Sequence, residues 1–133
     1  MKVERLAPKE VFDSAGSLQY AQAVRAGQIL FVSGQTGWGK NLQVPEKYED
    51  EVRQLFENLG HVLAEAGCSF ADVVDVTSFH TPDTDRATFW RIRNEFFSEP
   101  YPAWTMIRDI GLARPELHAE VKATAIVPTV VAR

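Results

Sequence analysis

Two segments near the carboxyl terminus place side chains capable of chemistry at alternating positions. These side chains are Trp104, Met106 and Arg108 in the first segment, and Glu120, Lys122 and Thr124 in the second. Side chains of a β-strand alternate between the two faces of its sheet, so each set shares one face. Two interpretations fit this pattern. The first is a half-buried sheet with ordinary cross-strand pairs, and the second is a pocket with Trp104 as an aromatic wall and Glu120 as a carboxylate.

A glycine-rich run from Gly34 to Lys40 follows a predicted strand and has the spacing G-x-x-x-x-G-K of a phosphate-binding loop. In that kind of loop a Ser or Thr follows the lysine and binds Mg²⁺, and a helix begins immediately. Here Asn41 follows the lysine, and no helical pattern begins there. The run therefore predicts a strand exit or a wide hairpin loop and not a nucleotide site.

Residues typical of metal sites and of nucleophilic catalysis are few and scattered. The histidines are His61, His80 and His118. None has a second His or Cys at the spacing of a zinc site, so no metal is expected. Cys68 follows Gly67 at the end of a predicted helix, where the negative end of the dipole disfavours a thiolate, and this predicts a packed, inert thiol. Ser33 lies before Gly34 but outside a G-x-S-x-G motif, so no catalytic triad is predicted.

The elements that hold these residues are predicted from local patterns. β-Forming residues at 20–25 and 28–33 flank a glycine, Gly27, and predict a β-hairpin whose turn needs a positive φ. Apolar residues recur at helical spacing over residues 52–66, after a run of acidic residues that complements the helix dipole. This pattern predicts a long amphipathic helix, and Gly67 stands where a glycine commonly follows a helix end.

The rest of the chain predicts three more strands and one more helix. The strands are expected at 73–80, 103–107 and 118–127, and the helix at 85–97 between the first two of them. The resulting order is ββ-α-β-α-ββ. With both helices on one face of a mixed or antiparallel sheet, this order predicts a two-layer α+β sandwich.

The composition restricts the class of protein. A chain of 133 residues with 45% hydrophobic and 24% charged residues is typical of one globular domain, here residues 1–133. The formal net charge is −4, which disfavours a nucleic-acid partner because such proteins usually carry a basic patch. The amino terminus lacks the apolar segment of a signal peptide, no apolar run is long enough to span a membrane, and the single cysteine has no disulfide partner. We therefore expect a cytoplasmic protein.

Several motifs along nearly the whole chain resemble the Rid (YjgF) family, whose relatives also carry the name endoribonuclease L-PSP. The motifs are Tyr20-x-Gln22-Ala23-Val24-x-x-Gly27, Phe31-Val32-Ser33-Gly34-Gln35, Phe56-Glu57-Asn58-Leu59, Asp72-Val73-Val74-Asp75-Val76-Thr77, Pro100-Tyr101-Pro102-Ala103 and Ala119-Glu120-Val121. The sequence is especially similar to a YjgH-like subgroup, through residues 78–81 and 102–105. The net negative charge disfavours the ribonuclease activity that the older name suggests.

The resemblance implies a fold, an assembly and an activity. The fold is chorismate-mutase-like, and the assembly is a homotrimer whose three sheets face a central barrel, with small-molecule clefts between subunits. Family members hydrolyse reactive imines and enamines to 2-oxo acids and ammonia without a metal or an organic cofactor. The resemblance also implies roles for single residues. Glu120 would position water, and Tyr20, Ser33, Gly34 and the backbone of Met106 would hold the ligand.

Trp104 is where this sequence departs from the family. The resemblance implies an arginine at this position, whose guanidinium binds the substrate carboxylate through two parallel hydrogen bonds. An indole has one N–H and no charge, so we expect simple 2-imino acids to bind poorly unless Lys122 or Arg108 enters the cleft. Two hypotheses follow. The chain is either a hydrolase of imines or enamines that lack an essential carboxylate, or a non-catalytic metabolite-binding or chaperone-like trimer.

Overall fold

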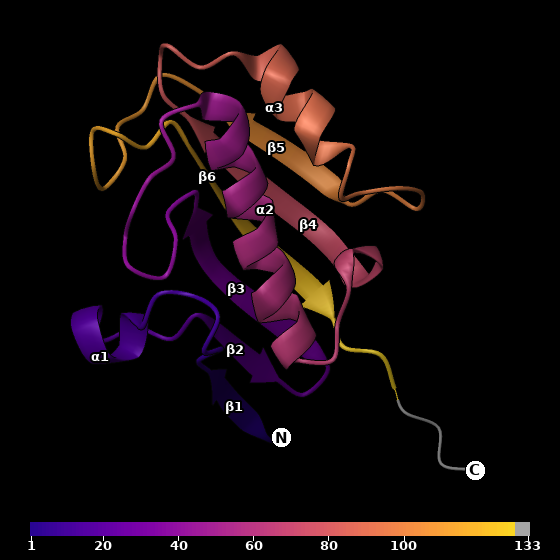
Figure 1. Cartoon of the computed structure of the whole chain (residues 1–133). Helices are drawn as coiled ribbons and strands as arrows, with labels where there is room; N and C mark the ends of the chain where they lie inside the picture. Colours follow the sequence, from indigo (N-terminus) through magenta and orange to yellow (C-terminus); the bar gives the residue numbers. More distant parts are fainter. Residues whose placement is uncertain (130–133) are drawn as a thin grey trace.

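The structure, a computed structural model, describes residues 1–129 and contains one six-stranded sheet (Figure 1). The strands are β1 (Val3–Leu6), β2 (Ala23–Ala26), β3 (Ile29–Thr36), β4 (Val73–His80), β5 (Ala103–Ile107) and β6 (Ala119–Ile126). They lie in the order β1-β2-β3-β6-β4-β5. All neighbours are antiparallel except β4 and β5, which run parallel. The last strand therefore lies in the middle of the sheet, between β3 and β4.

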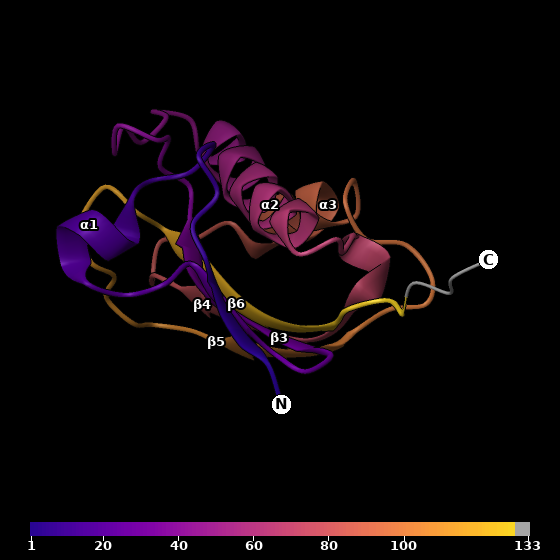
Figure 2. The ribbon, with the colours of Figure 1, turned by 90° about the horizontal axis from the view of Figure 1, so that it is seen from below.

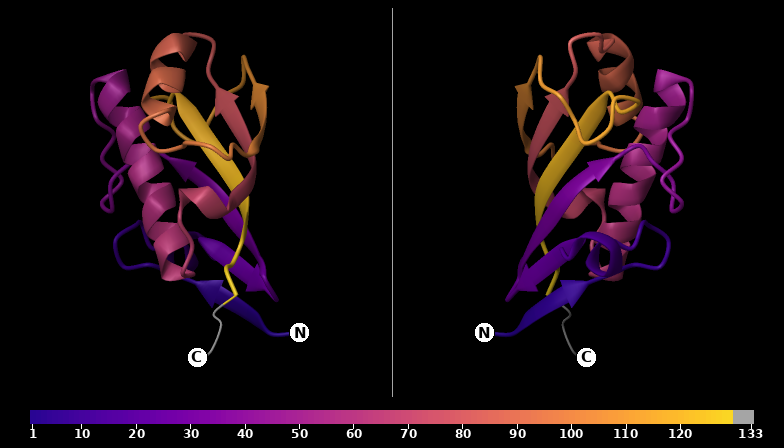
Figure 3. Two further views of the ribbon diagram at one scale, coloured as in Figure 1. Left: turned by 90° about the vertical axis from the view of Figure 1, so that its right-hand side faces the viewer. Right: turned by 90° about the vertical axis from the view of Figure 1, so that its left-hand side faces the viewer.

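The two longer helices cover one face of this sheet and leave the other face open (Figures 2 and 3). The helices are α1 (Ser14–Leu18), α2 (Tyr48–Glu65), the short 3-10 helix η1 (Phe70–Asp72) and α3 (Arg86–Arg93). The long helix α2 lies across the sheet, and α3 packs beside it above β4 and β5. This arrangement confirms the predicted two-layer α+β architecture. None of the helices in residues 1–129 combines the length and the apolarity needed to cross a bilayer.

Helix α2 forms where the apolar periodicity predicts it, and its apolar side builds the core. Its first turn carries Glu49, Asp50 and Glu51, which complement the positive end of the helix dipole. The side chains that face the sheet are completely buried, namely Val52, Leu55, Phe56, Leu59, Val62 and Leu63. Complete burial of one such side chain contributes about 1.5–3 kcal/mol relative to its exposure. Burial of this side of the helix therefore fixes α2 against the sheet.

The turn between β2 and β3 is the predicted hairpin. Ala26 pairs with Ile29, so only Gly27 and Gln28 lie between the strands. Gly27 has a φ of 63°, a conformation that suits glycine because it has no Cβ. The hairpin extends β3 to Thr36, three residues beyond the predicted end of the strand. This extension brings Gly34 into the sheet, next to Ser33.

The structure differs from the prediction at several short elements. Strand β1, helix α1 and η1 were not predicted; each has only three to five residues, too few to show a clear period. Helix α3 was predicted to reach Phe97 but ends at Arg93. Beyond it the chain turns so that Phe97 packs against Phe56 and Phe70, with ring centroids 6.0 and 5.0 Å apart. Aromatic packing explains why these residues leave the helix.

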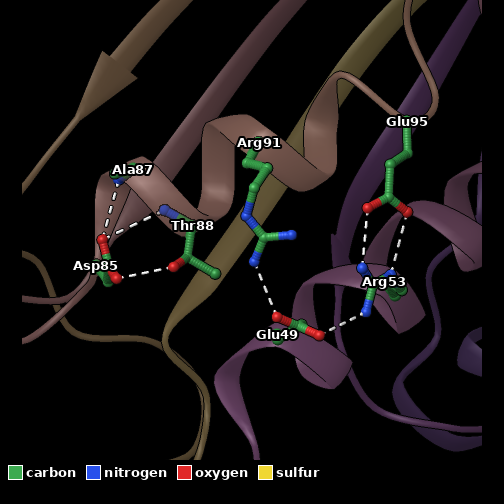
Figure 4. A network of polar contacts seen from close by, with 7 residues as sticks. All are labelled: Glu49, Arg53, Asp85, Ala87, Thr88, Arg91 and Glu95. Atoms are coloured by element: carbon green, nitrogen blue, oxygen red, sulfur yellow. Dashed lines mark hydrogen bonds and ion pairs between the residues drawn. The ribbon is translucent and has the colours of Figure 1, made fainter.

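Ion pairs connect the exposed sides of α2 and α3 (Figure 4). The guanidinium of Arg53 donates two hydrogen bonds to Glu95, at 3.1 and 2.8 Å. The carboxylate of Glu49 accepts from both Arg53 and Arg91, at 2.9 and 2.8 Å. These hydrogen bonds hold the pKa values of Glu49 and Glu95 below their usual range. The Asp85 side chain accepts from the backbone N–H groups of residues 87 and 88 and caps α3.

Candidate functional site

A cavity of about 650 Å³ lies on the sheet face that the helices leave uncovered. Its floor is formed by β3 and β6, and the segment after α1 closes one side. The polar residues around it are Tyr20, Ser33, Gly34, Thr36, Glu120, Lys122 and Thr124. Phe31, Trp38 and Phe79 supply apolar walls. The cavity therefore brings together five of the seven predicted site residues.

Topology explains how Ser33 and Glu120 become neighbours. Strand β6 pairs with β3, and the register shifts between Val32 and Gln35, where β3 carries one extra residue. Such a bulge re-aims the side chains around it. The two residues of β3 that form the bulge, Ser33 and Gly34, line the cavity with Glu120.

Gly34 allows the Glu120 carboxylate to lie directly against the backbone of β3. A Cβ at position 34 would stand 2.3 Å from Oε2 of Glu120 and 2.8 Å from its Cδ. A side chain at position 34 would fit only if the carboxylate moved. The absence of a Cβ at Gly34 therefore allows the carboxylate to lie where it does.

The environment of Glu120 raises the pKa of its carboxyl group. Burial is the cause, because it disfavours the charged form. The pKa of Tyr20 is also raised, first by burial and then by the negative charge of Glu120. Tyr20 therefore keeps its phenol proton and can donate a hydrogen bond into the cavity. The cavity therefore holds Glu120, a base of raised pKa, together with Tyr20, a neutral hydrogen-bond donor.

Ser33 is held in place by its own hydrogen bond. Its Oγ donates to the carbonyl oxygen of Ala21 at 2.7 Å, and its backbone N–H donates to the carbonyl oxygen of Gln22 at 2.9 Å. Because the hydroxyl proton is already used, the lone pairs of Oγ remain to accept from a ligand or a water. Ser33 is thus an oriented acceptor on the cavity floor.

Trp104 and Met106 do not line this cavity in the single chain. They lie on β5, at the edge of the sheet, with Trp104 packed on the helix side against Phe89 and Phe97 at 6.3 and 5.5 Å between centroids. The indole Nε1–H donates to Ser78 Oγ at 2.9 Å, and the Arg93 guanidinium lies 4.8 Å from the ring centroid. The predicted aromatic wall next to Glu120 is therefore absent within one chain, because Trp104 packs on the helix-covered side of the sheet.

Lys122 and Arg108, the two cationic residues considered as substitutes for the family arginine, line different hollows. Lys122 lines the cavity with Glu120, whereas Arg108 lines a different hollow beside α3. The pKa of the buried Cys68 thiol is raised, mainly by burial, as expected for a packed thiol. Within residues 1–129 no three His, Cys, Asp or Glu side chains are grouped so that they could hold a metal ion.

One polar contact was missed by sequence reasoning. The carboxylate of Glu51, 1% exposed, accepts hydrogen bonds from the backbone N–H of His118 at 2.7 Å and contacts its Nδ1 at 2.8 Å. This pair joins the start of α2 to the segment that leads into β6. It therefore supports the strand that carries Glu120. No local signal marks it, because the partners are 67 residues apart.

Comparison with known proteins assigns the family. The family model described as Endoribonuclease L-PSP matches residues 13–127. The chain belongs to the Endoribonuclease L-PSP family. It is 41% identical to the RutC family protein YjgH of Escherichia coli (strain K12) over 112 residues, which cover 83% of this chain and 84% of that protein. The Rid (YjgF) resemblance is thereby confirmed.

Further relatives of this Endoribonuclease L-PSP family member include an enzyme and a solved structure. A 2-iminobutanoate/2-iminopropanoate deaminase of Dermatophagoides farinae is 30% identical over 128 residues, covering 92% of this chain and 98% of that protein. The solved structure of protein YjgH matches with a TM-score of 0.84 and 37% identity, covering 96% of this chain and 99% of that chain. The fold and the family are therefore shared over almost the whole length.

Proposed function

We propose that this family member is a homotrimer that hydrolyses the C=N bond of small imines, or of enamines through their imine form, without a cofactor. The observation that carries the proposal is the Glu120 carboxylate, held against Gly34 beside Tyr20 and Ser33 in a cavity of about 650 Å³. A deaminase of imino acids among the relatives supports the same reaction class.

The residues of the cavity suit the steps of imine hydrolysis. Glu120 takes a proton from water as the water oxygen bonds to the imine carbon, and the π electrons of the C=N bond move to nitrogen. Glu120 then passes this proton to the nitrogen. In the collapse of the resulting carbinolamine, Glu120 takes the hydroxyl proton and delivers it to nitrogen, the C=O bond forms, and the C–N bond breaks with its electrons going to nitrogen, which releases ammonia and a carbonyl compound. The raised pKa of Glu120 makes it a stronger base than an exposed carboxylate.

The substrate class follows from the cationic groups. At the position where the family resemblance implies a carboxylate-binding arginine, this chain has Trp104, whose indole is hydrogen bonded to Ser78. Lys122 lines the cavity, but an ammonium is a point charge without the two-pronged geometry that fits a carboxylate. We therefore propose imines without an essential carboxylate as the better substrates, with Lys122 contacting a polar substituent.

The uncovered sheet face supports a trimer. It exposes large apolar side chains that a monomer would rarely leave in water, namely Ile29, Phe31, Ile107 and Ile126. Strand β5 also has a free edge. Association through this face and the β5 edge would bury these side chains and bring the strand that carries Trp104 and Met106 in one subunit toward the cavity of another.

The test is turnover on a panel of imines generated in solution, with and without a carboxylate, together with the native mass. We expect a trimer that releases ammonia faster from the uncharged imines than from 2-imino acids. Saturable binding without turnover on any imine would favour the alternative, a trimer that only binds metabolites. A monomeric mass would contradict the shared cleft.

A further inference from the structure

A second, smaller hollow of about 230 Å³ lies where β4 and β5 end, near the start of α3. The residues around it that matter for binding are His80, Thr81, Thr84, Arg86, Arg108 and Asp109. Its volume is several times the ~30 Å³ that one molecule occupies in liquid water. It can therefore hold a small polar molecule.

His80 has a buried ring nitrogen with no hydrogen-bond partner in the described part of the chain. The side chain is 1% exposed, and its Nε2 lies 2.9 Å from the hydroxyl of Ser78. Ser78 is completely buried, and its oxygen accepts from Trp104 Nε1–H at 2.9 Å. Within residues 1–129, Nε2 of His80 is the one acceptor that the Ser78 hydroxyl contacts, so we assign the Ser78 proton to this bond and the imidazole proton to Nδ1.

Nδ1 of His80 is buried and has no hydrogen-bond partner within residues 1–129. A buried N–H without an acceptor is unfavourable, and a ligand that accepts from it removes that cost. The low pKa of His80, about 4, which results first from burial and then from the charge of Arg86, keeps the ring neutral at physiological pH. The ring therefore offers an N–H rather than a charge.

Two arginines supply the charge of this hollow. None of the ion pairs formed within residues 1–129 uses Arg86 or Arg108. Asp83 and Asp85 are charged neighbours, but their carboxylates are hydrogen bonded to Thr81 and to the start of α3, and neither residue lines the hollow. The charged residues that do line it are Arg86, Arg108 and Asp109, so the lining itself carries one net positive charge.

The hydroxyl protons of the two threonines are already used in hydrogen bonds within the chain. Thr84 donates its hydroxyl proton to the carbonyl oxygen of His118 at 3.0 Å, and Thr81 donates to Asp83 at 2.8 Å. Among the side chains that line the hollow within residues 1–129, the donors left free are thus the guanidinium groups of Arg86 and Arg108, and His80, whose Nδ1 has no partner, lines it beside them. Guanidinium groups bind the oxygens of carboxylates and phosphates in preference to neutral ligands.

We propose that this hollow binds a small anion through carboxylate or phosphate oxygens, held by Arg86, Arg108 and the Nδ1–H of His80. The inference does not depend on the proposed hydrolysis, because it uses none of the residues around Glu120. The ligand is an anion small enough to fit beside α3, and both oxygen chemistries satisfy the same three donors.

The test is calorimetric titration of the full chain with inorganic phosphate and, separately, with malonate, at constant ionic strength set by sodium chloride. We expect saturable binding of at least one probe with a Kd on the order of 1 mM. Arg86→Gln and Arg108→Gln should each weaken it at least about tenfold, the scale of one lost charge-assisted hydrogen bond. Both arginines are exposed, so these changes leave the core intact.

Arg5→Gln is the matched control, because Arg5 is exposed on β1 and its loss changes the net charge equally. It should change the Kd less than about twofold, as expected for a distant exposed charge screened by salt. Tighter binding of phosphate or of malonate identifies which oxygen chemistry the site prefers. NMR of the His80 side chain should show the proton on Nδ1 and a shift of Nδ1 on binding. The absence of saturable binding for both probes, an equal weakening by Arg5→Gln, or a proton on Nε2 would overturn the proposal.

Discussion

Replacing Gly34 with alanine tests whether the contact between β3 and Glu120 prepares the cavity for chemistry. The added Cβ would stand 2.3 Å from Oε2 of Glu120. Ordinary contacts between such atoms begin near 3.4 Å, so the oxygen has to retreat by about 1 Å. The carboxylate faces an open cavity and can rotate away, while the backbone stays in place.

The magnitudes separate activity from stability in this variant. A displacement of about 1 Å in a reacting group costs about 10²-fold in rate. The strain of a displaced side chain costs about 1 kcal/mol, and replacing a strand glycine with alanine recovers about 0.5–1 kcal/mol of chain entropy. We therefore expect a large loss of imine hydrolysis with an almost unchanged free energy of unfolding.

The assay is ammonia release on the imine panel, together with urea unfolding and the carboxyl pKa of Glu120 measured by NMR. Moving the carboxylate toward water should lower that pKa toward its ordinary value. Gly39→Ala is the control, because a Cβ there would meet only the carbonyl oxygen of Gln43 at 3.9 Å. Full activity and an unchanged Glu120 pKa in folded Gly34→Ala would show that the contact between Gly34 and Glu120 does not position the carboxylate.

Three further predictions concern stability and use urea unfolding. Glu51→Ala should lower the free energy of unfolding by about 3 kcal/mol, because two donors of His118 lose their buried acceptor. Glu51→Gln should lower it less. Equal losses in the two variants would contradict the role of these hydrogen bonds. Because the pKa of His80 is about 4 in the folded chain and higher when unfolded, the unfolded state binds more protons below pH 6.5. Stability should therefore fall by about 2 kcal/mol between pH 7 and pH 5, and His80→Gln should remove most of this slope; equal slopes in the two proteins would count against it. Trp104→Phe should lower the free energy of unfolding by about 1 kcal/mol, because the hydrogen bond to Ser78 is lost, and Trp104→Ala should lower it by about 2–3 kcal/mol. An unchanged free energy of unfolding in both variants would contradict this prediction.

The main elements of the fold were predictable because each has a strong local period or turn signal. The periodicity over 52–66 and the glycine at 27 correspond to α2 and the β2–β3 turn. Strand β1 was missed because its four residues are only partly buried at a sheet edge. The end of α3 was predicted too late, since the packing of Phe97 against Phe56 and Phe70 is a tertiary effect.

The site was predictable only in part, for topological reasons. Alternation along 118–127 correctly put Glu120 and Lys122 on one face. The same rule applied to Trp104 could not tell which face the helices cover, and Trp104 lies on the helix side. The extra residue of β3 at Ser33 and Gly34 depends on pairing with the last strand, which no local pattern reveals.

The most direct test of the central claim is ammonia release by Glu120→Gln compared with the unchanged chain on an uncharged imine. Glutamine keeps the shape of the side chain but cannot accept the proton from water. We predict a loss of about 10²–10⁴-fold in kcat with ligand affinity retained, the scale of general base catalysis. Turnover by Glu120→Gln equal to that of the unchanged chain would contradict it.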